Sequence, residues 1–218
     1  MTLDIVLFDM DGTIVQYQNS PYQSSWDALG EVIGKKEEWD RLLQYYVHRP
    51  HQYQDWFEAN CRDLHGLRVE EVLRKLLPIP YTPGFLELCT RLQEKKIKTG
   101  MVSNGIDLIA REIQQEAGLD MVLANELHTA EGYFTGTGTM HVHIAEKGTA
   151  VRRVLRQQEV SRERVAYFGD HFNDIPAWQE VALPFGMNLK DERCYARVKA
   201  HFSDFQQARE YLEREELI

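Results

Sequence analysis

The stretch Asp9-Met10-Asp11-Gly12-Thr13 constrains this chain more than any other, because it follows directly on the apolar run from Ile5 to Phe8. Such a run predicts a fully buried strand, so two carboxylates stand where that strand ends. Side chains two residues apart on a strand share a face, so Asp9 and Asp11 can approach a common centre. Two carboxylates that close together favour a bound cation or a shared proton. Taken alone, the stretch is also compatible with ordinary turn and helix-cap chemistry.

The composition narrows the class of protein. The 218 residues are 43% apolar and 27% charged, which is typical of a soluble globular chain with one core and room for an insertion. The net charge of -9 argues against a nucleic-acid surface or an anionic membrane as partner, because both need clustered Lys and Arg. Cys61, Cys89 and Cys194 are far apart in apolar patterns, which favours buried free thiols in a reducing compartment. With no basic leader or apolar span in view, we expect a cytoplasmic monomer or homodimer.

The region after Thr13 differs in character from what precedes it. Residues 16–20 are polar, Pro21 interrupts the chain, and apolar residues then recur with helical spacing. They form four faces, which predict a small helical bundle: Trp26, Leu29 and Ile33; Trp39, Leu42, Leu43, Tyr46 and Val47; Tyr53, Trp56, Phe57, Asn60, Cys61 and Leu64; and Val69, Val72, Leu73, Leu76 and Leu77. The Pro- and Gly-containing stretch 78–84 ends the helices. We therefore expect a core domain of residues 1–16 and 80–218 and a helical cap domain of residues 17–79.

Strand and helix patterns alternate through the rest of the chain. Thr82 is expected to cap a helix that contains Phe85 and Leu92. The following expected elements are a strand at 99–102, a helix at 106–117, a strand at 121–124, a hairpin over 125–144 that turns at Glu131-Gly132, a helix from Lys147, strands at 164–168 and 182–187, and a helix at 205–212. This alternation predicts an α/β fold: a doubly wound, Rossmann-like parallel sheet with the helical-bundle cap inserted after the first strand and a β-hairpin.

Polar side chains follow three of the expected strands directly. Asp9 and Asp11 follow the first, Ser103 follows the strand at 99–102, and Asp170, Asn173 and Asp174 follow the strand at 164–168. Parallel sheets bind ligands at the carboxyl ends of their strands. Three segments that are far apart in the sequence are therefore expected to converge on one crevice.

Taken in order, Asp-x-Asp-Gly-Thr at 9–13, Ser103, Lys147 and Gly-Asp-x-x-Asn-Asp at 169–174 resemble the four motifs of the haloacid dehalogenase superfamily of phosphotransferases. The resemblance covers residues 1–15 and the chain from about residue 78 onward. The helical insertion is placed like the type-1 cap of that superfamily. Together with the hairpin before Lys147, it looks most like the phosphoserine-phosphatase-like branch.

The resemblance implies a role for each motif. Asp9 would be the nucleophile that forms an aspartyl-phosphate, and Asp11 would protonate the leaving alcohol and then activate water. Asp9, the Asp11 main-chain carbonyl and Asp170 would be the ligands of Mg²⁺. Asn173 and Asp174 would support the site without touching the ion, with Asp174 orienting metal-bound water or Lys147.

The chemistry of the residues agrees with a phosphate site. A phosphoryl group in transfer needs cationic or N–H donors on its equatorial oxygens. Ser103 and the main-chain N–H groups of Asn104 and Gly105 can supply donors at a helix start, and Lys147 adds a charge. Each also has an ordinary interpretation, since Ser103 could be a helix cap and Lys147 a surface lysine.

Three further sets of residues have weaker signals. Asn173 and Asp174 could merely cap the next helix. His171 lies inside the fourth motif and could touch the crevice, whereas His141 and His143 alternate on the hairpin without a third metal ligand nearby and receive no role.

These features predict a Mg²⁺-dependent phosphomonoester hydrolase that acts on a small phosphorylated metabolite through an aspartyl-phosphate. One alternative is a phosphomutase or another phosphotransferase of the same fold. A second is a non-catalytic binding or regulatory protein, but its expected sign is loss of Asp9, Lys147 or Asp170, and all three are present.

One departure from the family bears on the substrate. In phosphoserine phosphatases a glutamate nine residues after the nucleophile is expected to pair with the substrate's ammonium group, and here that position is Gln18. A neutral amide binds an ammonium less strongly than a carboxylate does, so phosphoserine is predicted to be a poor substrate. The candidate partners for a substrate carboxylate in the cap are Arg41, Arg49, Arg62 and Arg68, and the sequence singles out none of them.

Overall fold

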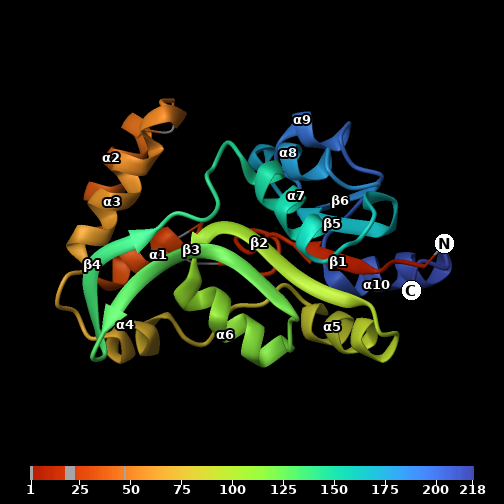
Figure 1. The fold of residues 1–218 in the computed structure, drawn as a ribbon, viewed down its shortest axis with the longest axis horizontal. Coiled ribbons are helices and arrows are strands. Elements are labelled where there is room, and N and C mark those ends of the chain that lie inside the picture. The colour runs from red at the N-terminus through yellow and green to blue at the C-terminus, as the bar shows by residue number, and fades with distance from the viewer. Residues whose placement is uncertain (1, 18–22, 47) are drawn as a thin grey trace.

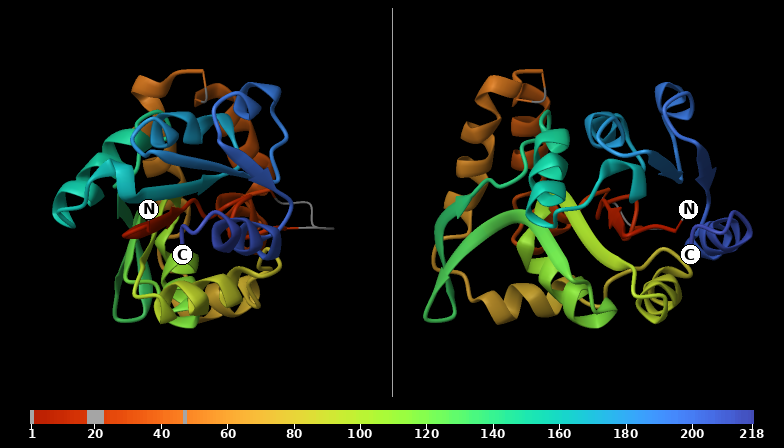
Figure 2. Two further views of the ribbon diagram at one scale, coloured as in Figure 1. Left: turned by 90° about the vertical axis from the view of Figure 1, so that its right-hand side faces the viewer. Right: turned by 45° about the vertical axis from the view of Figure 1, so that its right-hand side comes forward.

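The computed structural model describes residues 2–17, 23–46 and 48–218, so Gln18 and Val47 lie outside the described residues. The described residues form one sheet of seven strands in the order β4-β3-β2-β1-β5-β6-β7, with helices on both of its faces (Figures 1 and 2). A further group of helices gathers at one end of the sheet (Figure 1). In this part of the chain no helix is long and apolar enough to cross a membrane.

Six of the strands run parallel, and only β3 and β4 pair antiparallel, as the predicted hairpin requires. The strands are β1 (Ile5–Phe8), β2 (Lys98–Ile106), β3 (Met121–Ala130), β4 (Tyr133–Thr139), β5 (Val165–Gly169), β6 (Leu183–Met187) and β7 (Ala200–Phe202). Glu131 and Gly132 form the hairpin turn with φ of 50° and 81°, the pair of positive angles that a tight two-residue hairpin favours. The predicted doubly wound α/β architecture is confirmed.

The four helices predicted for the insertion after β1 are all present among the described residues. They are α1 (Ser25–Val32), α2 (Lys36–Tyr46), α3 (Tyr53–Asp63) and α4 (Val69–Leu76). The remaining helices are α5 (Phe85–Glu94), α6 (Asp107–Ala117), α7 (Lys147–Gln157), α8 (Ile175–Trp178), α9 (Glu192–Tyr195) and α10 (Phe205–Arg214). Short 3-10 turns cover Pro50–Gln52, Arg162–Arg164 and Phe172–Asp174.

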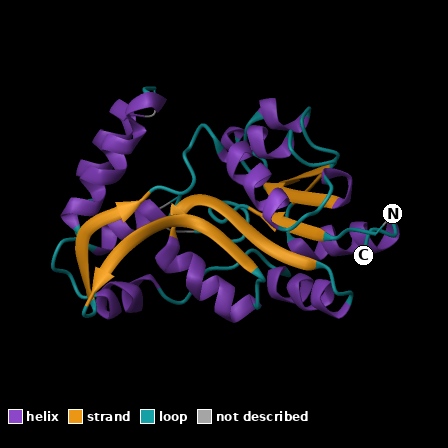
Figure 3. Ribbon diagram, viewed as in Figure 1, coloured by secondary structure: helices purple, strands orange, loops and turns teal. Residues whose placement is uncertain are grey.

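The central strand β1 is apolar throughout because it is covered on both faces (Figure 3). Val6 and Phe8 belong to a hydrophobic cluster that contains Phe85 of α5 and Phe205 of α10. Ile5 and Leu7 point to the opposite face, as strand alternation dictates, and join the cluster that contains residues of α7. The sheet is thus a buried middle layer, and its strand ends are where polar side chains can gather.

The hairpin connects the sheet to the inserted helices. Strands β2 and β3 curve toward them in Figure 1, and α3 packs on β4. A methyl group at Gly138 would lie 2.7 Å from the Phe57 ring and 3.0 Å from Cys61 Sγ, so this glycine permits the close packing. The Phe134 N–H donates to the Leu67 carbonyl, and its carbonyl accepts from the Gly66 N–H, both at 3.0 Å.

Two local expectations are wrong. Thr82 does not cap α5: the residue before the helix is Gly84, and the Thr82 hydroxyl instead donates to the Thr13 carbonyl at 2.6 Å. The strand expected at 99–102 is longer than predicted, because β2 continues to Ile106, whereas α6 begins at Asp107, next to the expected start at 106. The β2–β3 register shifts between Val102 and Ile106, which places residues 103–105 in an irregular strand end. The short elements β7 and α9 were not expected from the sequence.

Candidate active site

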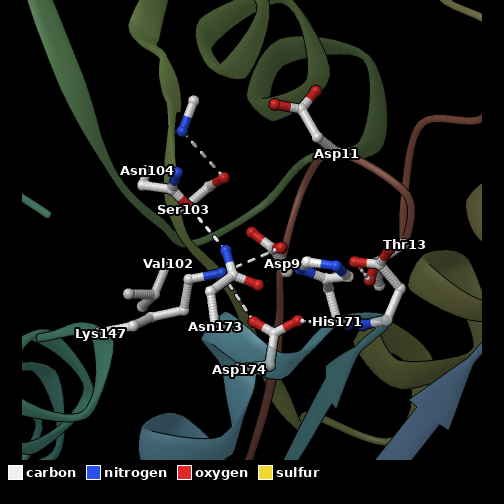
Figure 4. A network of polar contacts seen from close by, with 12 residues as sticks. Asp9, Asp11, Thr13, Val102, Ser103, Asn104, Lys147, His171, Asn173 and Asp174 are labelled. Carbon is white, nitrogen blue, oxygen red and sulfur yellow. Dashed lines mark hydrogen bonds and ion pairs between the residues drawn. The ribbon is translucent and has the colours of Figure 1, made fainter. Parts of the chain in front are cut away.

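The three polar segments predicted to converge do so around the end of β1. Strand β1 lies between β2 and β5, so Asp9, Ser103 and Asp170 come from neighbouring strand ends. Figure 4 shows Asp9 and Ser103 together with Asp174 from the loop after β5. The strand order reverses direction here, which is where open α/β sheets bind ligands. Lys147, the first residue of α7, completes the group.

Lys147 is a completely buried cation rather than a surface lysine. Its Nζ lies 2.9 Å from Asp9 Oδ2 and 2.6 Å from Asp174 Oδ1. Burial alone would lower the pKa of Lys147, but Asp174 and Asp9 outweigh that effect and hold the pKa above its usual value. The ammonium therefore stays charged and fixes the position of one oxygen of Asp9.

Asp174 uses both of its carboxylate oxygens to hold other parts of the site. Oδ1 accepts hydrogen bonds from Lys147 and, at 3.1 Å, from the Tyr167 hydroxyl. Oδ2 accepts from the main-chain N–H groups of Asp170 at 3.0 Å and His171 at 3.2 Å. The side chain thus turns back onto the loop after β5 and does not cap α8.

The buried Asp9 and the half-buried Asp170 belong to a group of carboxylates beside the ammonium of Lys147. Oxygens of Asp9, Asp170 and Asp174 all lie within 4.8 Å of one another, and Asp9 Oδ1 is buried without a hydrogen-bond partner. Burial raises the pKa of Asp9 to about 6 and that of Asp170 well above its usual value, because Lys147 offsets only part of the cost. Hard carboxylate oxygens with an unpartnered member are the donor set that a divalent cation prefers. The residues present therefore fit a metal ion.

Gly12 allows Asp170 to approach the first motif. Its φ is +82°, and a Cβ there would lie 2.1 Å from Asp170 Oδ2. Any side chain at this position would displace the carboxylate or bend the backbone. The Thr13 hydroxyl donates to Asp170 Oδ1 at 3.5 Å, a long bond that adds a weak restraint.

Asp11 is held separately from Asp9. Its Oδ1 accepts from the Ser25 N–H at 2.9 Å, and its Oδ2 accepts from the Ser25 hydroxyl at 2.7 Å. Figure 4 shows the Asp11 carboxylate turned away from the group formed by Asp9, Lys147 and Asp174. Burial raises the pKa of Asp11 to about 7, although the bonds from Ser25 act in the opposite direction. A group that titrates near neutrality suits a residue that must both give and take a proton.

The segment after Val102 is fixed from several sides. The buried Ser103 hydroxyl accepts from the Gly105 N–H at 3.2 Å, so it is not a helix cap. The Asn104 carbonyl accepts from Trp26 Nε1 at 3.2 Å and Asn125 Nδ2 at 2.9 Å. Asn173 Nδ2 donates to Asn104 Oδ1 at 3.1 Å, which links the fourth motif to the second.

Residues 6–179 match the family model of the haloacid dehalogenase-like hydrolases. The chain belongs to that family. It is 29% identical over 189 residues to a phosphoserine phosphatase of Archaeoglobus fulgidus, an alignment that covers 86% of this chain but only 53% of the relative. It is 24% identical over 187 residues to the phosphoserine phosphatase of Idiomarina loihiensis, with 85% and 82% covered.

Solved structures of this family share the fold. A phospho-aspartyl intermediate analogue of a phosphoserine phosphatase superposes with a TM-score of 0.77 at 22% identity, over 97% of this chain and 99% of that one. A haloacid dehalogenase family hydrolase from Salmonella enterica superposes with a TM-score of 0.79 at 17% identity, over 93% and 68%. The fold of this chain, over more than nine tenths of its length, is thus one that these solved structures share.

Two residues of this haloacid dehalogenase-like site escaped the sequence analysis. The buried Asn125 amide accepts from the N–H groups of His141 and Val142, both at 2.9 Å, and so ties the start of the segment leading to Lys147 to Asn104. An Asn inside a strand, where it is disfavoured, was the available signal. Ser25 gave no signal, because serine at a helix start is normally a cap.

The histidines of the hairpin stay outside the site. Within the described ranges, the one group of His, Cys, Asp and Glu with metal-ligand spacing is the aspartate group, which contains neither His141 nor His143. His171, in contrast, lines the cleft beside the site, in agreement with its position in the fourth motif. Burial lowers the pKa of His171 below its usual value.

The site opens into a cleft of about 1070 Å³ between the sheet and the inserted helices. The helical wall contains Trp26, Trp39, Tyr53, Trp56, Lys36, Asp27 and Asp40. Ring centroids of Trp26 lie 5.1 Å from Trp56 and 6.0 Å from Trp39, so these rings pack mainly on one another. None of Arg41, Arg49, Arg62 and Arg68 is among the described residues that line the cleft.

Proposed function

We propose that this chain is a Mg²⁺-dependent phosphomonoester hydrolase that works through an aspartyl-phosphate on Asp9. The observation that supports this most directly is the state of the Asp9 carboxylate. Lys147 fixes one oxygen at 2.9 Å, whereas the other is buried and has no partner. A buried anionic oxygen without a partner is costly unless a ligand compensates it, and an electrophilic phosphorus or a metal ion would do so.

The proposed reaction has two steps, formation and hydrolysis of the aspartyl-phosphate. In the first, a carboxylate oxygen of Asp9 bonds to phosphorus, the bond from phosphorus to the ester oxygen breaks, and Asp11 gives that oxygen a proton. In the second, Asp11 takes a proton from water, the water oxygen bonds to phosphorus, and Asp9 leaves as a carboxylate. The Ser103 hydroxyl, the N–H groups of Asn104 and Gly105, and Lys147 would bind the phosphoryl oxygens.

We assign the metal to Asp9, the main-chain carbonyl of Asp11 and Asp170. When bound, Mg²⁺ would supply positive charge to the transferring phosphoryl group. Asp174, whose oxygens are occupied by four donors, would hold Lys147 and the loop instead. Asn173 would keep the second and fourth motifs together through Asn104.

We infer that residues 17–79 move as a cap over this site. Its two connections run side by side, since Val15 and Tyr81 form an antiparallel bridge and the Gln16 N–H donates to the Pro80 carbonyl at 2.8 Å. Paired connections of this kind allow a cap to rotate as a unit. Closure would exclude bulk water, which protects a reactive acyl phosphate.

The proposed substrate is a small phosphorylated metabolite. The relatives are phosphoserine phosphatases, which makes phosphoserine the first compound to test. The neutral amide at Gln18 predicts that it is not the preferred one. The cation that lines the cap wall is Lys36, but its Nζ lies 2.7 Å from Asp40 Oδ2 and 4.0 Å from Asp27 Oδ1. A substrate carboxylate would have to compete with both aspartates for it.

A panel of phosphomonoesters tests the proposal. Purified protein with Mg²⁺ should release phosphate from at least one ester and become labelled by a hydroxylamine-sensitive phosphoryl group. If phosphoserine gives the highest kcat/KM of the panel, the inference from Gln18 is wrong. Transfer to a second hydroxyl without free phosphate would indicate a phosphomutase. No turnover of any ester would leave the non-catalytic alternative.

A further inference from the structure

Ser25, the first residue of α1, is hydrogen-bonded directly to the Asp11 carboxylate, although it lies outside the four motifs. It is fully buried and donates two hydrogen bonds, from its N–H to Oδ1 at 2.9 Å and from its hydroxyl to Oδ2 at 2.7 Å. Two donors from one residue to the two oxygens of one carboxylate fix both its position and the plane of the group. Ser25 is 14 positions from Asp11 and belongs to the inserted helices rather than to the sheet.

The contact is part of a three-way junction with the end of β2. The Ser25 hydroxyl oxygen accepts from the Ile106 N–H at 3.4 Å. A Cβ at Gly105 would lie 2.7 Å from Ser25 Oγ and 2.8 Å from Asp11 Oδ2, so the absence of a side chain there lets these atoms meet. The Asp11 carboxylate therefore sits beside the main chain assigned to phosphate binding, held in place by α1.

A hydroxyl is well suited to this position. In the proposed reaction Asp11 alternates between a protonated and an ionised form, and its partner must bind both. A main-chain N–H can only donate, but a serine hydroxyl can donate to a carboxylate or accept from a carboxylic acid. Ser25 can thus hold Asp11 in the same place throughout the cycle.

We propose that Ser25 is a positioning residue that aims Asp11 at the leaving-group oxygen and makes this aim depend on the seating of α1 against the core. The proposal rests on the proposed phosphatase function. Trp26, the next residue, donates to the Asn104 carbonyl and so secures the same helix to the phosphate-binding segment. Movement of α1 away from the core would break the Ser25 bonds to Asp11 and the Trp26 bond to the Asn104 carbonyl together.

Two substrates distinguish a misplaced acid, Asp11, from a general loss of activity. An alkyl phosphate needs a proton on its leaving oxygen, whereas p-nitrophenolate leaves without one, and kcat/KM reports the steps up to this departure. Ser25→Ala keeps the main-chain bond but loses the hydroxyl. It should lower kcat/KM for the alkyl ester about tenfold or more, because acid–base catalysis can contribute a factor of about 10²–10⁴. The kcat/KM for p-nitrophenyl phosphate should fall less than about threefold. Ser25→Cys, which keeps the volume but donates weakly, should fall between Ser25→Ala and the unaltered protein.

Ser24→Ala is the matched control. The Ser24 hydroxyl caps the same helix by accepting from the Asp27 N–H at 3.1 Å, and among the described residues the hydrogen bonds to the Asp11 carboxylate come from Ser25 instead. This variant should destabilise α1 and yet leave the alkyl-to-aryl ratio of kcat/KM unchanged. Asp11→Asn sets the scale, because it should shift the ratio in the same direction and further.

The outcomes are distinct. An equal loss on both esters in Ser25→Ala, or a ratio like that of Ser24→Ala, overturns the positioning role. If the unaltered protein hydrolyses neither ester nor any other phosphomonoester, the proposed function fails first and the role of Ser25 fails with it. Thermal melting of each variant shows whether an equal loss comes from unfolding, and Ser25→Cys then decides the matter in a folded protein.

Discussion

The Nζ of Lys147 lies 2.9 Å from Oδ2 of Asp9, and the two side chains are only 0% and 4% exposed. The pair joins the first residue of α7 to the residue that follows β1, two positions that are far apart in the sequence. It also holds a cation beside the carboxylates of Asp9, Asp170 and Asp174, whose oxygens lie within 4.8 Å of one another. The ammonium therefore compensates part of the buried negative charge of Asp9 and Asp174 in this corner of the molecule.

Lys147→Met is expected to destabilise the protein. Removal of one partner from a buried ion pair leaves charge without compensation, at a cost of about 3–5 kcal/mol in the free energy of unfolding. Lys95→Met, at an exposed position after α5, should change it by no more than about 0.5 kcal/mol. Denaturant titration of both variants measures the difference. Equal stability of the two would show that the buried pair is not a structural requirement.

Asp9→Asn should abolish turnover and leave the fold intact. The amide keeps the shape of the side chain but is a poor nucleophile and a poor metal ligand. Burial already raises the pKa of Asp9 to about 6, so loss of the charge removes a desolvation cost along with the bond to Lys147. We expect the free energy of unfolding to change by about 1 kcal/mol or less. Appreciable residual turnover by a folded variant would exclude the covalent route.

Activity should require Mg²⁺ and be inhibited by Ca²⁺. Mg²⁺ prefers octahedral coordination with several waters, whereas Ca²⁺ accepts bidentate carboxylates and more ligands. A bidentate Asp9 would have no oxygen left to attack phosphorus. Initial rates at fixed Mg²⁺ and rising Ca²⁺ measure this, and full activity in excess chelator would reject the metal assignment.

The sequence predicted those site residues that lie directly after a strand. Asp9, Asp11, Ser103 and Asp170 were found because each follows an apolar strand pattern, and the order of these patterns determines the sheet. Lys147 was singled out by the resemblance to the haloacid dehalogenase motifs. The structure brings all five to one edge. Their chemical roles remain the proposals made above.

The sequence did not predict partners that depend on three-dimensional packing. Thr82 has the residue type of a cap, but the Thr13 carbonyl, 69 positions away, competes for its hydroxyl. The contact between the Ser25 hydroxyl and Asp11 was not predicted, because nothing in the local sequence indicates it. Residues 103–105 extend β2 because the neighbouring strand shifts register there, which no periodicity within the segment reveals.

The three cysteines should be unreactive in the folded protein. Burial raises the pKa of Cys61 and Cys89 to about 12 and that of Cys194 to about 11. Because the thiolate is the reactive form, a thiol of pKa about 12 is only about 0.01% ionised at pH 8. An aromatic disulfide reagent should therefore detect no thiols before denaturation and three after it. Fast labelling of the native protein would show that one of the three is accessible.

Gly12 and Gly34 offer a matched pair for testing how Asp170 is placed. Both have positive φ, +82° and +74°, so alanine costs both of them a similar conformational strain. They differ in their surroundings. A Cβ at Gly12 would lie 2.1 Å from Asp170 Oδ2, whereas a Cβ at Gly34 would have nothing within 4 Å.

Gly34→Ala should therefore lower the free energy of unfolding by about 1 kcal/mol and leave activity unchanged. Gly12→Ala should show at least that loss and also push the Asp170 carboxylate out of reach of Asp9. Because metal affinity depends on the position of each ligand, we expect the Mg²⁺ concentration for half-maximal activity to rise about tenfold or more. Titration of Mg²⁺ for both variants isolates this effect from the shared strain. If Gly12→Ala needs no more Mg²⁺ than Gly34→Ala, the contact between Gly12 and Asp170 does not position a metal ligand.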